Sequence, residues 1–348
     1  MGETEASLRP AESTASAQPQ TWRPDLLGDR FEHLTLPLGS DDEGEVVATL
    51  VRYRPRWRPR LTRGAASGAD VLYVHGWSDY FFNRELAEFW AGLGARFYAL
   101  DLRKYGRSLR PGQVPGFVAD LATYDADIEA ALAAMGQPDA TSPASGRPLI
   151  LLGHSTGGLT LSLWAARHPG RAAALVLNSP WLEFQLSKVG RQALAPMMEL
   201  GARVHPLAPL PNVDLGFYTR AVAREQGGEW EYDHEWRPDR GFATSPAWLM
   251  AILAGHATVD AGIDVGAPVL TLLSARSTIL ARWDEAMRST DSVLVVDEIA
   301  QRALKLGPSV TVARIDGALH DVFLSREPVR AEAYADITRW LRGYGPAR

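Results

Sequence analysis

A serine flanked by glycines stands where an apolar run of the chain ends. Residues 148–158 read Pro-Leu-Ile-Leu-Leu-Gly-His-Ser-Thr-Gly-Gly, which places Ser155 just after four consecutive apolar residues. An apolar run of this length, bounded by turn residues, indicates a strand buried on both faces. Residues 159–167 then show helical spacing. We therefore expect Ser155 at the junction between a strand and a helix.

The segment Gly153-His154-Ser155-Thr156-Gly157 matches G-x-S-x-G, a tight turn that presents a nucleophilic serine above a sheet. Glycine is expected at 153 and 157 because a Cβ there would collide with the backbone of the turn. The start of the following helix supplies N–H groups and positive potential where an oxyanion would form. A glycine-rich turn with an inert serine is the alternative, and the flanking strand and helix favour the nucleophile.

A serine hydroxyl needs a base and an orienting carboxylate to become a nucleophile. Among the eight histidines, His320 alone follows the last predicted strand, at 310–315. It would therefore lie at the same carboxyl edge of the sheet as Ser155, and we predict that it is the base. His75 and His154 fall in turns beside the serine strand, and for His75 a structural role is favoured.

The carboxylate is harder to place, because the loop after the strand predicted at 269–273 begins without an acid. Asp291 precedes apolar residues, as expected for an acid at the end of a loop, and we predict that it orients His320. A helix N-cap is the alternative role for Asp291. Asp297, inside the helix predicted at 293–306, stays open as the alternative acid.

Two further groups of residues complete the predicted site. The strand at 71–74 runs into a His-Gly-Trp turn, and the backbone N–H groups of Trp77 and Thr156 are expected to form an oxyanion hole. Aromatic residues outside the strand–helix alternation are assigned either to a substrate pocket or to packing against the main domain. These aromatic residues are Trp181, Phe184, Phe217 and Tyr218.

Strands and helices alternate along most of the chain, which predicts an α/β fold with a mostly parallel central sheet and helices on both faces. The alternation fails at 181–262, predicted to be an inserted cap between core segments 22–180 and 263–348. A disordered tail is expected at 1–21. The remaining strands are predicted at 31–38, 46–53, 95–100 and 172–177, and the remaining helices at 121–135 and 328–341.

Composition narrows the function. A hydrophobic content of 46% and a charged content of 22% are typical of a globular protein, and a net charge of −5 indicates no nucleic-acid partner. With no cysteine, disulfides and thiolate zinc sites are excluded, and a cytoplasmic location is expected. No transmembrane segment, metal-binding motif or phosphate loop is evident, so we expect no cofactor and a small-molecule ester as substrate.

An arginine-rich stretch extends from Arg52 to Arg63. Arginines at every second position from 52 to 60 alternate with aromatic residues and prolines, which on an extended chain puts the guanidinium groups on one side. A solvated edge strand with its loop is the favoured interpretation, and an anionic partner is the alternative.

With these residues in view, the chain resembles the α/β-hydrolase superfamily, in particular its monoacylglycerol lipase and serine aminopeptidase-like branch, over about residues 30–343. The resemblance is carried by His75-Gly76, the 101–108 loop, the 153–158 turn, the segment after Pro180, and 317–320. Members of the superfamily usually have Gly where Lys104 stands and Asp where Ser277 stands. The second departure indicates a lengthened loop before Asp291.

The resemblance implies a serine hydrolase with an α/β-hydrolase fold and a Ser-Asp-His order of the triad. Its substrates would be carboxylic esters, monoacylglycerol- or lysophospholipid-like, cleaved through an acyl-enzyme on Ser155. Peptidase, thioesterase and acyltransferase activities share the same triad, and a non-catalytic ligand-binding protein is the alternative of a different class.

Overall fold

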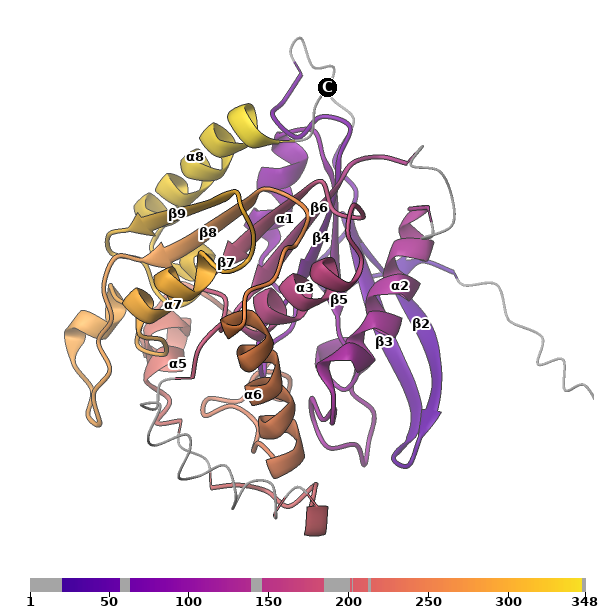
Figure 1. Cartoon of the computed structure of the whole chain (residues 1–348), viewed down its shortest axis with the longest axis vertical. Coiled ribbons are helices and arrows are strands. Elements are labelled where there is room, and N and C mark those ends of the chain that lie inside the picture. The colour runs from indigo at the N-terminus through magenta and orange to yellow at the C-terminus, as the bar shows by residue number, and fades with distance from the viewer. Residues whose placement is uncertain are drawn as a thin grey trace, which may run out of the picture.

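The computed structural model describes residues 21–56, 63–138, 146–184, 201, 203–211 and 214–345. In these ranges the strands form one sheet in the order β1-β2-β3-β5-β4-β6-β7-β8-β9 (Figure 1). The strands are β1 (Arg23–Pro24), β2 (Phe31–Asp41), β3 (Gly44–Tyr53), β4 (Asp70–Val74), β5 (Arg96–Asp101), β6 (Leu149–His154), β7 (Ala174–Asn178), β8 (Val269–Ser274) and β9 (Val310–Ile315).

The sheet is antiparallel from β1 through β3 to β5 and parallel from β5 to β9. Every residue of β4, β6, β7 and β8 is buried, which is why these segments read as continuous apolar runs rather than alternating ones. The predicted mixed, mostly parallel α/β sheet is confirmed.

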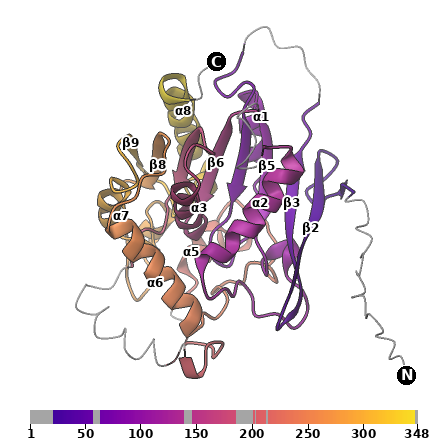
Figure 2. The same ribbon diagram turned by 45° about the vertical axis from the view of Figure 1, so that its right-hand side comes forward.

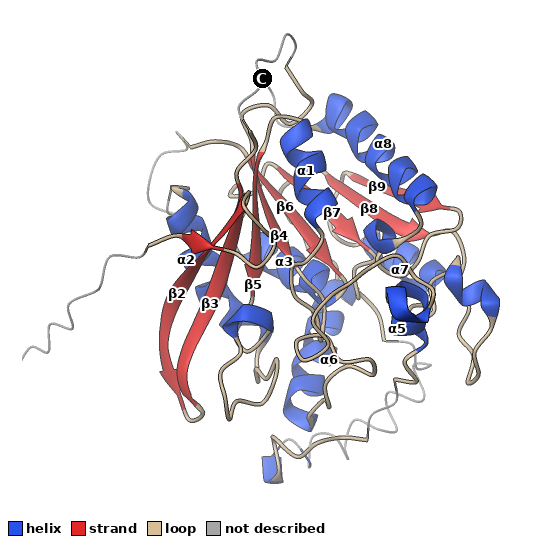
Figure 3. Ribbon diagram, turned by 180° about the vertical axis from the view of Figure 1, so that it is seen from behind, coloured by secondary structure: helices blue, strands red, loops and turns tan. Residues whose placement is uncertain are grey.

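Helices cover both faces of the sheet (Figures 2 and 3). One face carries α1 (Arg84–Gly92) and α8 (Glu327–Tyr344), and the other carries α2 (Tyr124–Met135), α3 (Thr156–Arg167) and α7 (Val296–Ala303). Two large apolar cores result, centred on Trp90 and on Trp164. Short 3₁₀ turns are η1 (Gly106–Ser108), η2 (Leu121–Thr123), η3 (Arg224–Gln226), η4 (Glu285–Arg288) and η5 (Val322–Leu324).

The edge-strand interpretation of the arginine-rich stretch is wrong for its first residues. Strand β3 is internal, because Arg52 is paired in register with Glu32 of β2 and with Tyr98 of β5. The Arg52 guanidinium binds Glu32 at 2.6 Å and lies 4.0 Å from the ring centre of Trp22. The pairing with β5 is a long-range contact that the local alternation of residues does not reveal. Arg58 and Arg60 lie outside the described residues.

The segment between β7 and β8 contains α5 (Phe217–Val222) and α6 (Pro246–Asp260). Figure 1 places both helices beyond the ends to which the parallel strands point. Residues 185–200, 202 and 212–213 of this segment, and residues 1–20 of the predicted tail, lie outside the described ranges, and the predicted domain boundaries stay a prediction. Within the described ranges, no helix is both long and apolar enough to cross a membrane.

Candidate active site

Ser155 occupies a one-residue turn between β6 and α3. Its backbone has φ 51° and ψ −118°, a strained conformation that L residues rarely adopt. The glycines at 153 and 157 are there for the expected steric reason. A Cβ on Gly153 would lie 2.7 Å from the Cα of Gly158, and one on Gly157 would lie 2.3 Å from the carbonyl oxygen of His75. The close approach of helix to strand thus requires glycine at both positions.

One path of hydrogen bonds joins Ser155, His320 and Asp291. The Oγ of Ser155 is 3.1 Å from the Nε2 of His320, and the Nδ1 of His320 is 3.0 Å from the Oδ2 of Asp291. Since a carboxylate accepts, Nδ1 carries the ring proton and Nε2 is left to accept the proton of Ser155. The alternative acid, Asp297, is exposed on α7 and pairs with Arg314 at 2.5 Å.

Asp291 reaches His320 because the chain leaves the sheet edge and returns to it. Residues Ser277 and Asp291 pair as an isolated bridge, with Thr278 donating to the Asp291 carbonyl at 2.8 Å. The Oδ1 of Asp291 accepts from the N–H groups of Val293 (2.7 Å) and Leu294 (2.8 Å). Asp291 therefore caps a backbone turn with one oxygen and binds His320 with the other, and helix α7 begins only at Val296, later than predicted.

The loop that carries His320 is clasped by Asn178, a residue that sequence analysis did not assign to the site. The Asn178 amide donates to the Oδ1 of Asp321 at 2.6 Å and its Oδ1 accepts from the N–H of Val322 at 3.0 Å. Its backbone carbonyl accepts from the N–H of Ser155 at 3.1 Å. The available signals were a polar residue ending the apolar run at 172–177 and an acid next to His320.

Two buried histidines border the site and are held neutral. The Nε2 of His75 accepts from the N–H of Leu102 at 3.1 Å, and burial lowers the pKa of His75. His154 contacts the carbonyl of Asn178 through Nδ1 at 3.1 Å. Burial lowers the pKa of His154 to about 4, although Asp321, 4.0 Å away, acts in the opposite direction. A neutral His154 adds no positive charge that would oppose protonation of the neighbouring His320 ring.

The turn after β4 abuts the serine. A Cβ added to Gly76 would lie 3.0 Å from the Cβ of Ser155, so the His75–Trp77 turn passes directly beside the nucleophile position. Thr156, at the start of α3, is the residue after the serine. Both predicted oxyanion donors, Trp77 and Thr156, thus belong to backbone segments that border Ser155.

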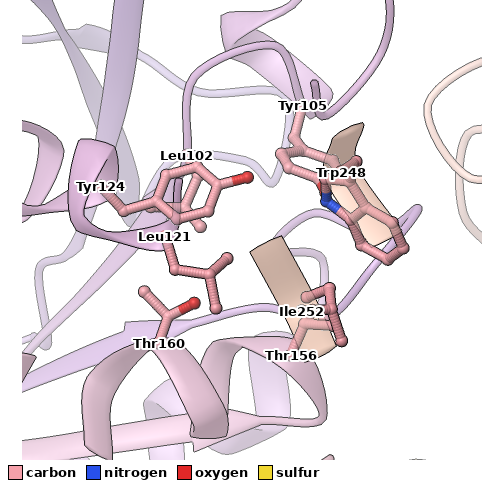
Figure 4. Close-up of a pocket in the computed structure, with 9 residues that line it drawn as sticks. Leu102, Tyr105, Leu121, Tyr124, Thr156, Thr160, Trp248 and Ile252 are labelled. Atoms are coloured by element: carbon pink, nitrogen blue, oxygen red, sulfur yellow. The ribbon is translucent and has the colours of Figure 1, made fainter. Parts of the chain in front are cut away.

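A small cavity of about 10 Å³ opens between these two segments (Figure 4). Trp248 and Ile252 come from α6, and Thr156 and Thr160 from α3. The full set of lining residues is Gly76, Leu102, Tyr105, Leu121, Tyr124, Thr156, Thr160, Trp248 and Ile252.

None of the four aromatic residues predicted for a substrate pocket is among the described residues that line this cavity, although the ring centre of Trp181 is 6.2 Å from that of the lining Trp248. The ring of Tyr218 is 5.5 Å from that of His320, and its hydroxyl accepts from the N–H of Asp321 at 3.2 Å. Trp181 and Phe184 lie together, with ring centres 5.7 Å apart. Phe217, on α5, packs against Trp283 with ring centres 6.0 Å apart. Their role in substrate binding stays a prediction.

The chain is similar in sequence to known proteins. A family model described as serine aminopeptidase, S33, matches residues 65–327. The chain belongs to this family. The monoacylglycerol lipase of Mycolicibacterium smegmatis is 25% identical over 278 residues, which cover 78% of this chain and 87% of that protein.

Solved structures of similar fold extend the comparison. The monoacylglycerol lipase of Paleococcus ferrophilus has a TM-score of 0.57 at 19% identity, covering 81% of this chain and 96% of its own. A soluble variant of the monoglyceride lipase of Saccharomyces cerevisiae, in complex with a substrate analog, has a TM-score of 0.58 at 14% identity, covering 97% and 99%. These likenesses show the α/β-hydrolase fold.

This member of the S33 family has a lysine in the left-handed region of the backbone. Lys104 has φ 61°, where a glycine is more usual, and its side chain is buried. Its Nζ binds Asp41 at 2.7 Å and also Glu43, at the tip of the β2–β3 hairpin. Two ion pairs thus compensate for the backbone strain and fasten the hairpin to the loop after β5.

Proposed function

We propose that the protein is a serine hydrolase that cleaves carboxylic esters through an acyl-enzyme on Ser155. The observation that carries the proposal is the hydrogen-bonded path from Asp291 through His320 to Ser155, which ends at a strained serine at the start of a helix. Membership of a family of serine hydrolases supports the same reaction. A non-catalytic ligand-binding protein would need neither the strained backbone nor the aligned base.

Acylation begins when the Oγ of Ser155 attacks the ester carbonyl carbon while His320 Nε2 takes the hydroxyl proton. The carbonyl electrons move to oxygen, and the N–H groups of Trp77 and Thr156 hold the resulting oxyanion. Collapse breaks the bond to the alcohol oxygen, which leaves with the proton from His320. The acyl group stays on Ser155.

Deacylation repeats these steps with water. His320 takes a proton from water as the water oxygen attacks the acyl carbon, and collapse returns the proton to the Oγ of Ser155. The net reaction converts an ester and water into a carboxylic acid and an alcohol. Asp291 stays ionised throughout and stabilises the imidazolium of His320.

The names of the relatives favour monoacylglycerol- or lysophospholipid-like esters, with residues 181–262 as a cap that selects the substrate. In this proposal Trp181, Phe184, Phe217 and Tyr218 contribute the aromatic side of the binding site. Peptidase, thioesterase and acyltransferase reactions pass through the same acyl-enzyme. The length of the acyl chain depends on the space beside Ser155.

The test is covalent labelling by a fluorophosphonate together with turnover of p-nitrophenyl acetate. Wild type should be labelled and active, and Ser155→Ala should lose both. Ser162→Ala is the matched control, because Ser162 is a buried serine of α3 whose hydroxyl only donates to the Gly158 carbonyl at 2.7 Å. Equal labelling of wild type and Ser155→Ala would overturn the assignment.

A further inference from the structure

The position of the cavity beside Ser155 determines which part of an ester substrate it receives. Its lining includes Thr156, the residue after the serine, and Gly76, where an added Cβ would lie 3.0 Å from the Cβ of Ser155. In the proposed reaction the leaving oxygen must come within hydrogen-bond reach of the Nε2 of His320 to take its proton. Among the described residues, neither His320 nor Tyr218 lines the cavity. The alcohol therefore lies on the His320 side, and the cavity receives the acyl group.

The cavity is lined in part by Trp248 and Tyr105, and both of these rings contact Trp77. Trp248 of α6 packs on Trp77 with ring centres 3.9 Å apart, and Tyr105 meets Trp77 edge-on at 5.8 Å. Trp248 and Tyr105 are both almost fully buried. This aromatic cluster thus includes Trp77, whose backbone N–H is a proposed oxyanion donor.

Helix α6 packs closely against its neighbours next to the cavity. A Cβ added to Gly255, one turn beyond Ile252, would lie 3.0 Å from Leu121 and 3.1 Å from Leu163. Helix α6 therefore approaches η2 and α3 as closely as a glycine permits. Ile252 itself is completely buried at this contact.

Two of the four hydroxyl groups at the cavity, those of Tyr105 and Tyr124, are paired within the protein. The Tyr105 hydroxyl donates to Tyr124, whose hydroxyl donates to the Gly116 carbonyl at 3.4 Å. Burial raises the pKa of both phenols above the ordinary value, so both stay neutral at physiological pH. The acyl group thus meets aromatic and aliphatic surface and no charge.

The volume sets the size of the acyl group. A space of about 10 Å³ is roughly what one water-sized group occupies. The methyl of an acetyl group is of this size, whereas each further methylene must push Trp248 or Ile252 out of close packing. We infer that this enzyme is selective for esters of short acyl groups, acetyl above all, with Trp248 and Ile252 as the residues that limit chain length. The inference rests on the proposed ester hydrolysis and goes against the long-chain substrates that a lipase-like family suggests.

The first test is the chain-length profile of the wild-type enzyme, measured as kcat/KM for p-nitrophenyl acetate, butyrate and octanoate below their micellar concentrations. Acetate should exceed octanoate by at least about tenfold, the discrimination typical of one or two methylenes that do not fit. Fluorophosphonate labelling is measured in parallel. Labelling with a profile that is flat or favours octanoate would overturn the short-chain subsite alone, and no labelling would overturn the proposed function together with it.

The second test enlarges the cavity. Ile252→Ala should raise the octanoate-to-acetate ratio of kcat/KM by about tenfold, since it removes the atoms that a longer chain would displace. Leu249→Ala is the matched control, because Leu249 lies on the same helix, is partly buried and does not line the cavity. If Ile252→Ala folds poorly, Trp248→Phe serves as the second cavity variant. This smaller change at the cavity should shift the ratio in the same direction. Unchanged ratios in both cavity variants would overturn the assignment of these residues.

Discussion

The side-chain amide of Asn178 donates to the carboxylate of Asp321 across 2.6 Å, which joins two loops whose residues are 143 positions apart in the chain. Asn178 ends β7, and Asp321 follows His320. The same Asn178 accepts from Val322 through its side chain and from Ser155 through its backbone carbonyl. A single residue therefore ties the turn that carries Ser155 to the loop that carries His320.

Removing this clasp should impair catalysis more than stability. Asn178→Ala frees the His320 loop, and we expect kcat to fall by about tenfold to a hundredfold with KM little changed, because a displacement of about 1 Å of the base is costly. The rate of fluorophosphonate labelling should fall in parallel. Gln113→Ala is the control, since Gln113 is also buried and bonded to backbone, but to Arg110 and Glu45 and not to the His320 loop. A similar loss of labelling rate in both variants would mean that Asn178 acts only through general stability.

The acid is tested by a pair of isosteric changes. Asp291→Asn leaves the size of the side chain intact but removes the charge that orients His320, and kcat should fall by about three to four orders of magnitude. Asp297→Asn should leave kcat within about twofold, because Asp297 is exposed and pairs only with Arg314. Circular dichroism checks that both variants are folded. The opposite ranking of the two variants would move the orienting acid from the loop to α7.

The glycines of the serine turn predict a contrast in stability. Gly157→Ala places a Cβ 2.3 Å from a backbone oxygen, which must displace the His75 turn, so we expect a loss of several kcal/mol in the free energy of unfolding and loss of activity. Gly92→Ala is the control, because Gly92 ends α1 with open space around it. There alanine should be neutral or stabilise by up to about 1 kcal/mol. Urea unfolding of both variants measures the difference, and equal destabilisation would refute the steric argument.

His154 predicts how stability depends on pH. Burial lowers the pKa of His154 from 6.5 to about 4, so between these values the unfolded chain binds a proton that the folded protein does not. Stability from this group is full above about pH 6.5 and is lost as pH falls towards 4, by on the order of 3 kcal/mol. His154→Asn keeps a donor for the Asn178 carbonyl and should reduce the fall between pH 7 and 4.5.

The matched control for this measurement is His205→Asn, which changes an exposed histidine. Its unfolding free energy should follow the wild-type dependence on pH. An equally steep fall in His154→Asn and in wild type would show that other groups cause the acid sensitivity.

Sequence analysis predicted the features that depend on residues close together in the chain. The apolar run before Ser155 and the helical spacing after it predicted the strand and helix that the structure has, because a buried parallel strand must be apolar on both faces. The position of Asp291 followed from the apolar residues after it and the missing acid at Ser277. The structure brings Asp291 to His320, and the catalytic role of the three residues stays a prediction.

The features that it missed depend on contacts between distant segments. The clasp of Asn178 on Asp321 and the pairing of β3 with β5 each join parts of the chain that no local pattern relates. The close packing of α6 next to the cavity likewise depends on which face of that helix meets α3. Trp248 and Ile252 have nothing in their sequence surroundings that distinguishes them from core residues.

A buried ion pair joins Arg237, in the segment between β7 and β8, to Asp79, which follows the 75–77 turn, and it leads to a final prediction. The Nε of Arg237 lies 3.2 Å from the Oδ1 of Asp79, and the guanidinium lies 4.4 Å from the ring centre of Tyr232. Burial raises the pKa of Asp79 to about 7, and Arg237 acts against this rise. Without Arg237, the pKa of Asp79 would rise further.

Arg237→Met should therefore destabilise the protein in a manner that depends on pH. At pH 8 Asp79 is ionised in the wild type, so loss of its partner should cost about 3–5 kcal/mol of unfolding free energy. At pH 5.5 Asp79 is mostly protonated in both proteins, and the loss should be clearly smaller, because the folded state with a raised pKa gains stability as pH falls. The double variant Asp79→Asn with Arg237→Met should recover part of the loss at pH 8. Urea unfolding at both pH values measures these differences, and a loss independent of pH would show that Arg237 stabilises the segment through its packing on Tyr232 and not through its charge.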